Sequence, residues 1–152
     1  MTHDASSGVS RSMVRRALLL SLALIAIGAP LARALPPGPP PKRGGGPPPA
    51  WLEKPGTDRW LAYSTFCWTT MCADFVSPQS RTDLPRIRIE RGTTVRFHLG
   101  FRPTSLTLAR SGGRSRRLPA TRVVAWRAAG PGVYLLQAGV VGGDASYAFR
   151  VV

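Results

Sequence analysis

The sequence contains few of the residues from which active sites and metal centres are built. Its 152 residues include two cysteines, two histidines and seven acidic residues. His98 is the only histidine after the first 34 residues, and no motif gives it the hydrogen-bonding partner that a general acid or base needs. We therefore expect a protein that is not an enzyme and that holds neither a cofactor nor a metal.

Known catalytic and ligand-binding motifs are also missing. The chain has no Walker loop, no Gly-x-Ser-x-Gly, no His-Glu-x-x-His and no EF-hand calcium loop. A blue-copper centre needs two histidines and a cysteine, so a single histidine after residue 34 excludes it. Helical periodicity is absent beyond residue 51, which argues against an α-helical domain.

Positive charge is abundant. The chain has 21 basic and seven acidic residues, and 17 basic and six acidic residues remain when the first 34 residues are left out. Lys42 and Lys54 are its only lysines. This excess favours anionic partners, although arginine-rich coding in a GC-rich genome would also produce it, and both explanations stay open. Nucleic acid is not an expected partner, because no alternation of aromatic and basic residues indicates base stacking.

The N-terminal region has the pattern of an export signal. Arg15 and Arg16 precede an apolar run over 17–31, which ends at Ala32-Arg33-Ala34. The run is shorter than the roughly 20 residues of a membrane-spanning helix. We predict a helical signal peptide over 1–34 that is cut after Ala34, and hence a secreted or cell-envelope-associated protein. Twin-arginine export and an uncleaved membrane anchor through 17–31 are the alternatives.

A segment rich in proline and glycine follows over 35–50. Proline lacks the N–H that helices and sheets need, and glycine loses much entropy on ordering. We predict a disordered linker that separates the signal from the domain. The alternative is a ligand for a proline-recognising groove.

The domain is predicted over 51–152. Apolar residues alternate with polar ones in short runs that are separated by turn residues, which is typical of strands. The expected strands cover 61–68, 86–90, 94–99, 105–109, 122–126, 133–141 and 145–152, with a loop over 111–117. About seven short strands favour an all-β fold, an antiparallel two-sheet sandwich of immunoglobulin-like type.

Both cysteines lie close together in a stretch rich in aromatic residues. In an exported chain, an even number of cysteines favours a disulfide, here Cys67–Cys72. Five extended residue steps span about 16 Å, whereas bridged Cα atoms lie within roughly 7 Å. The chain between the cysteines must therefore turn. A redox-active pair or a soft-metal site is the alternative, although the spacing is not Cys-x-x-Cys.

One motif resembles a known group of proteins. Cys67-Trp68…Cys72-Ala73-Asp74, with Arg-Gly at 91–92 and Gly-Val-Tyr at 132–134, is similar to small secreted or envelope-attached bacterial proteins that have an aromatic-Cys-Trp…Cys-Ala-Asp motif. The resemblance implies an immunoglobulin-like or cupredoxin-like sandwich over about 60–152, and it implies no activity. Ser-Thr-Phe over 64–66 departs from the simpler Gly-Ser-Tyr expected before the first cysteine.

Arginines are the remaining candidate site residues. Guanidinium groups bind phosphates and carboxylates through paired hydrogen bonds. We expect a non-enzymatic domain for interaction or structural support that binds an anionic envelope polymer or lipid, or another envelope protein; a solvated basic face is the simpler explanation. It would contact membrane only if the N-terminal segment stays uncleaved. The candidate anion-binding residues are Arg86, Arg88, Arg96, Arg110, Arg114, Arg116 and Arg117.

Overall fold

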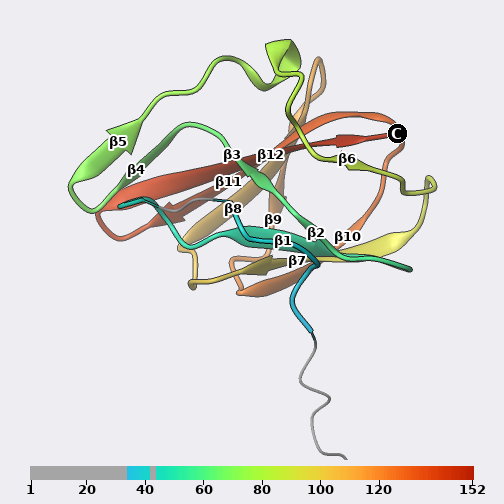
Figure 1. Cartoon of the computed structure of the whole chain (residues 1–152), viewed down its shortest axis with the longest axis horizontal. Coiled ribbons are helices and arrows are strands. Elements are labelled where there is room, and N and C mark those ends of the chain that lie inside the picture. The colour runs from blue at the N-terminus through green and yellow to red at the C-terminus, as the bar shows by residue number, and fades with distance from the viewer. Residues whose placement is uncertain (1–33, 42–43) are drawn as a thin grey trace, which may run out of the picture. The chain divides into compact units, whose positions relative to one another are not determined.

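Strands form nearly all of the regular structure in the described residues of this protein. The computed structural model describes residues 34–41 and 44–152 (Figure 1), and no α-helix occurs within them. A short 3-10 helix, η1, covers Pro78–Ser80. The strands are β1 (Ala50–Glu53), β2 (Arg59–Trp60), β3 (Ala62–Tyr63), β4 (Phe66–Trp68), β5 (Met71–Ala73), β6 (Arg86–Ile87), β7 (Thr94–Leu99), β8 (Ser105–Arg110), β9 (Ser115–Leu118), β10 (Val123–Arg127), β11 (Gly132–Val140) and β12 (Gly143–Val151).

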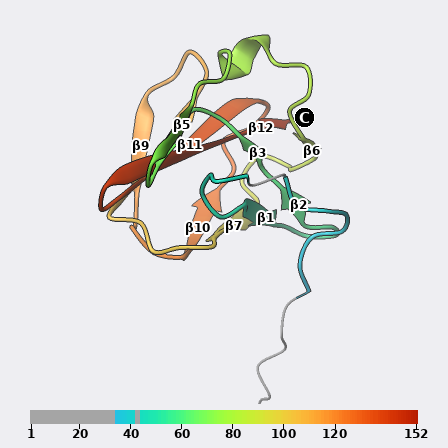
Figure 2. The ribbon, with the colours of Figure 1, turned by 60° about the vertical axis from the view of Figure 1, so that its left-hand side comes forward.

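The strands form two sheets that face each other. The four-stranded sheet has the order β10-β7-β1-β2, and the eight-stranded sheet has the order β5-β4-β12-β11-β8-β9. In the latter, β3 and β6 also pair with β12, β6 in parallel. Figures 1 and 2 show the two sheets as separate layers, with the β4–β5 hairpin at one end. The predicted all-β, two-sheet sandwich is confirmed, and its immunoglobulin-like type stays a prediction.

Alternation along the strands determines which side chains enter the core. In β7, Val95, Phe97 and Leu99 are buried, and Leu106 and Leu108 of β8 are buried as well. Side chains of successive strand residues point to opposite faces, so one face of each strand is apolar. These inward positions are those that the sequence predicted.

Aromatic rings join the two sheets at the centre of the core. Phe97 and Trp126 come from the four-stranded sheet, and Tyr134 and Phe149 come from the eight-stranded sheet. Ring centroids lie 5.0 Å apart for Trp126–Tyr134 and 5.7 Å apart for Phe97–Phe149. Burial of a ring of this size contributes about 1.5–3 kcal/mol. This cluster therefore fixes how β7 and β10 lie on β11 and β12.

One predicted loop is partly a strand. The prediction of a loop over 111–117 is wrong for residues 115–117, which belong to strand β9 (Ser115–Leu118) and pair with β8. Gly112, at φ 71°, allows the tight turn between the two strands. The sequence Ser-Arg-Arg-Leu has little apolar alternation because β9 lies at the sheet edge, where backbone hydrogen bonds to β8 decide the structure.

The described part of the proline-rich segment packs against the domain. The hydroxyls of Tyr63 and Tyr147 donate to the carbonyls of Pro47 and Pro48, at 2.7 Å and 2.6 Å. Proline offers no N–H, but its carbonyl still accepts, and two tyrosines supply the donors. Residues 35–152 form one compact unit, so the packed unit begins before the predicted boundary at residue 51.

The predicted signal peptide over 1–34 lies outside the described residues apart from Ala34, and so does the alternative anchor over 17–31. Within the described part of the chain, no helix has the length and apolar character to cross a membrane.

Candidate anion-binding site

The disulfide fastens the hairpin of β4 and β5. Cys67 and Cys72 are direct cross-strand partners with Cα atoms 4.1 Å apart, and their sulfur atoms are bonded. The chain turns at Thr69, which has φ 53°. The predicted disulfide and turn are confirmed, and the thiol-redox and metal-binding alternatives stay predictions. Within the described residues, no three His, Cys, Asp or Glu side chains gather as metal ligands would.

The candidate arginines occupy different places on the molecule. Arg110, Arg114, Arg116 and Arg117 lie along the β8–β9 hairpin, whereas Arg86 and Arg88 lie at and just after β6. Arg96 is in β7, on the outer face of the four-stranded sheet. The candidate arginines thus divide into one group along the hairpin and others that lie elsewhere, and anion binding by any of them stays a prediction.

Four arginines line one hollow beside the β8–β9 hairpin, which we call the arginine hollow. Its volume is ≈ 270 Å³. None of the described residues that line it is acidic, and aromatic and apolar side chains complete its wall. The lining residues are Leu108, Arg110, Gly113, Arg114, Arg116, Trp126, Arg127, Ala129 and Tyr134.

Backbone carbonyls hold two of these arginines. Nη2 of Arg110 donates to the carbonyl of Pro131 at 2.5 Å, and Nε of Arg127 donates to the carbonyl of Gly92 at 3.1 Å. A carbonyl leaves the charge of a guanidinium uncompensated and leaves further N–H groups to donate. All four arginines are exposed, and Arg110 and Arg127 are the two that a backbone carbonyl orients.

Tyr134 forms an ordered polar group beside the arginines. Its hydroxyl donates to the carbonyl of Gly130 at 2.7 Å. Burial raises the pKa of this hydroxyl, and the positive charge of Arg110 opposes the rise. The hydroxyl thus stays protonated near neutral pH and adds no negative charge to the hollow.

Strand register separates Arg117 from its neighbour Arg116. Arg116 is opposite Leu108, which is buried, whereas Arg117 is opposite Thr107 on the other face of the sheet. Side chains alternate between faces, so Arg116 borders the arginine hollow and Arg117 points away from it. The two residues form a matched pair for experiments.

A second basic hollow lies near β6, with a volume of ≈ 470 Å³. Its lining residues are Lys54, Thr57, Arg59, Arg86, Arg88 and Val152. Arg88 also borders a neighbouring hollow that Glu90 lines. A negative side chain therefore stands close to this second group, in contrast to the arginine hollow.

Arg96 is engaged with a carboxylate. Its Nη1 lies 2.9 Å from Oε1 of Glu53, and Nε2 of His98 lies 2.7 Å from Oε2 of the same residue. The ring of His98 stacks on Trp51 with centroids 3.7 Å apart. No sequence motif indicates a partner for His98, and pairing of β1 with β7 supplies Glu53 from 45 residues away. Arg96 is thus a weaker anion-binding candidate than the arginines of the hollow.

Arg127 is a member of the site that the sequence did not predict. Arg127 lies in β10 of the four-stranded sheet, while Arg110 and Arg116 lie in the eight-stranded sheet. Only the packing of the two sheets brings them together. The sequence signal that could have indicated Arg127 is weak. Arg127 is the last residue of a strand in which Val124 and Trp126 point inward.

Comparison with known proteins assigns no function, so a functional proposal depends on the geometry of the site. No family model, no curated protein and no solved structure matches this chain. The resemblance to small secreted bacterial proteins therefore stays a prediction.

Proposed function

We propose that this protein is a non-enzymatic domain that binds an anionic polymer or lipid of the cell envelope through the arginine hollow. The observation that carries the proposal is the meeting of Arg110, Arg114, Arg116 and Arg127 around one hollow whose described lining contains no acid. The excess of 17 basic over six acidic residues after residue 34 supports it.

The chemistry of the hollow suits phosphate or carboxylate groups. A guanidinium presents a rigid fork of donors that matches either anion with two parallel hydrogen bonds. Arg110 and Arg127 are held by carbonyls, so they lose little side-chain freedom when an anion binds. Arg114 and Arg116 are exposed and can close on a charged group from the solvent side.

The test compares arginines inside and outside the hollow. We expect Arg114→Ser with Arg116→Ser to weaken retention on phosphatidylglycerol vesicles at low salt by roughly tenfold or more, since a basic side chain at an anionic surface contributes about 1 kcal/mol. Co-sedimentation of the protein with vesicles gives the affinity. Binding should be lost at about 1 M salt, where the Debye length is about 3 Å.

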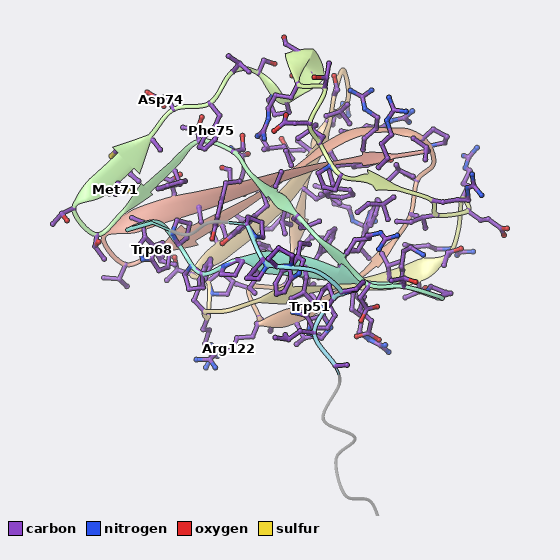
Figure 3. All side chains as sticks on the ribbon, in the orientation of Figure 1. Trp51, Trp68, Met71, Asp74, Phe75 and Arg122 are labelled. Carbon is purple, nitrogen blue, oxygen red and sulfur yellow. A yellow bond between two sulfur atoms is a disulfide. The ribbon has the colours of Figure 1, made fainter. Side chains whose placement is uncertain are left out.

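Matched controls separate the site from net charge. Arg102→Ser with Arg122→Ser removes the same charge from exposed residues outside the hollow, and Figure 3 shows Arg122 at the margin of the molecule. Arg116→Ser against Arg117→Ser compares the two faces of β9. If both double variants weaken retention equally, binding depends on the net charge of the protein and not on the arginine hollow. Unchanged retention in all variants would reject the proposal.

A further inference from the structure

The outer face of the four-stranded sheet carries a row of three rings. Trp60 of β2 is the cross-strand partner of Trp51 of β1, and Trp51 is the partner of His98 of β7. Leu52 and Phe97, the adjacent residues along β1 and β7, are fully buried in the core. Because side chains alternate, the row points away from the core.

The row is held in place before any ligand arrives. The rings of Trp51 and His98 are parallel within 6°, and Oε2 of Glu53 fixes Nε2 of His98 at 2.7 Å. An arrangement that is already ordered loses little entropy when it binds. We call Trp60, Trp51 and His98 the aromatic row.

The chain's own proline-rich segment contacts one end of this row, at Trp60. The indole Nε1 of Trp60 donates to the carbonyl of Gly38 at 3.2 Å, and Pro36 is buried although it belongs to no strand. Trp51 is only 9% exposed, although it points to the outer face. Gly38 is therefore tied to Trp60 and Pro36 is buried, whereas the other prolines up to residue 40 are exposed.

These contacts suit proline chemistry. A proline-rich segment has carbonyls but few N–H groups, so a site that binds it needs apolar rings for the pyrrolidines and a donor for a carbonyl. Domains that recognise proline-rich ligands use aromatic grooves for the same reason, and the stiff ligand costs little entropy. Gly38, at φ 81°, adds a bend after Pro36 and Pro37.

We propose that the aromatic row is a binding site for proline-rich segments of a partner protein, and that residues 35–41 occupy it in cis as a competitor. The short connection from residue 41 to β1 at Ala50 keeps this segment at an effective concentration on the order of mM. A partner segment must outcompete it. The site lies on a different sheet face from the arginine hollow, so this inference does not depend on the proposed function.

The experiment weakens binding of residues 35–41 within the chain and supplies the same sequence as a separate peptide. The probe is a fluorescent peptide with the sequence of residues 35–41, Leu-Pro-Pro-Gly-Pro-Pro-Pro. In the full chain, Pro36, Pro37, Pro39 and Pro40 are replaced by serine. We expect the peptide to bind this variant at least tenfold more tightly than it binds the unmodified chain, as measured by fluorescence anisotropy.

Two controls test the contacts themselves. In the serine variant, Trp60→Phe keeps a ring but removes the indole donor and should weaken peptide binding roughly fivefold. Trp68→Phe, which changes a ring packed on Phe101 and outside the aromatic row, should leave binding unchanged. A peptide with serine in place of every proline should not bind. Equal affinity for the proline and serine peptides, or no effect of Trp60→Phe, would overturn the proposal.

The unmodified chain offers a test that does not depend on a multiple variant. The indole N–H of Trp60 should exchange with deuterium slowly because Gly38 accepts it, and excess proline peptide should shift its NMR signal. An indole signal that stays unmoved at saturating peptide would show that residues 35–41 only anchor the chain, which rejects binding in trans.

Discussion

Glu53 connects two strands through its two carboxylate oxygens. One oxygen meets Arg96 and the other meets His98, both from β7. The Glu53 side chain is 13% exposed, whereas that of Arg96 is 55% exposed. A carboxylate that is largely out of water depends on such donors, so its partners stabilise the β1–β7 pair more than an exposed ion pair would.

Replacement of Glu53 by alanine should therefore reduce stability. We expect Glu53→Ala to lower the free energy of unfolding by about 2 kcal/mol, because two hydrogen bonds to a charged group are lost. Urea unfolding followed by tryptophan fluorescence measures the change. Glu90→Ala, at an exposed position, should change it by less than about 0.5 kcal/mol. Equal effects would show that the contacts of Glu53 add nothing.

The sequence predicted His98 on the polar face of its strand but not its partner. Period-2 alternation places His98 beside Arg96 and opposite Phe97 without reference to any other strand. The partner depends on the register of β1 against β7, in which Trp51 is opposite His98 and Glu53 is opposite Arg96. The two strands are more than 40 residues apart in the sequence. Their register follows from the packing of the whole sheet, and the alternation within a single strand does not determine it.

The β4–β5 hairpin contains an unusual turn. Trp68 is opposite Met71, so Thr69 and Thr70 form the turn, and Thr69 has φ 53°. A β-branched residue in the left-handed region is strained, at roughly 1–2 kcal/mol. The disulfide next to the turn helps to keep the chain in this conformation.

Glycine at the strained position should stabilise the hairpin. We expect Thr69→Gly to raise the free energy of unfolding by about 1 kcal/mol, since glycine adopts positive φ without the steric cost. Thr70→Gly is the matched control and should lower it slightly, because Thr70 has no positive φ to relieve. Thermal unfolding by circular dichroism compares the variants. A lower melting temperature for Thr69→Gly than for Thr70→Gly would contradict the assignment of strain.

At the scale of strands, sequence reasoning succeeds where alternation is strong. Strands β7 and β8 were predicted nearly to the residue because their apolar residues fill the core at every second position. Strand β9 was missed because an edge strand can pair through its backbone with little apolar content.

Acidic residues neutralise only part of the positive charge of the molecule. Within the described residues, Arg81 pairs with Asp83, and Glu53 serves both Arg96 and His98. Basic residues outnumber acidic ones by 17 to six after residue 34, so there are too few acidic residues to pair with most of the cations. Repulsion of this kind destabilises a compact state.

Salt should therefore stabilise this protein. We expect the melting temperature to rise by roughly 5 °C, or about 1 kcal/mol, from low ionic strength to about 0.5 M sodium chloride, because screening weakens repulsion between exposed charges. Differential scanning calorimetry measures the change. A fall in melting temperature would mean that the few ion pairs outweigh the repulsion.

The two ends of the eight-stranded sheet differ in a way that limits self-assembly. Strand β9 presents Arg116 and Arg117 at one end, and β5 at the other is three residues long and is tied back by Cys67–Cys72. Fibrous growth would require each copy to extend the sheet of the next with a long, flat, uncharged border. Neither border of this sheet meets that requirement, so growth of fibres through the eight-stranded sheet is disfavoured.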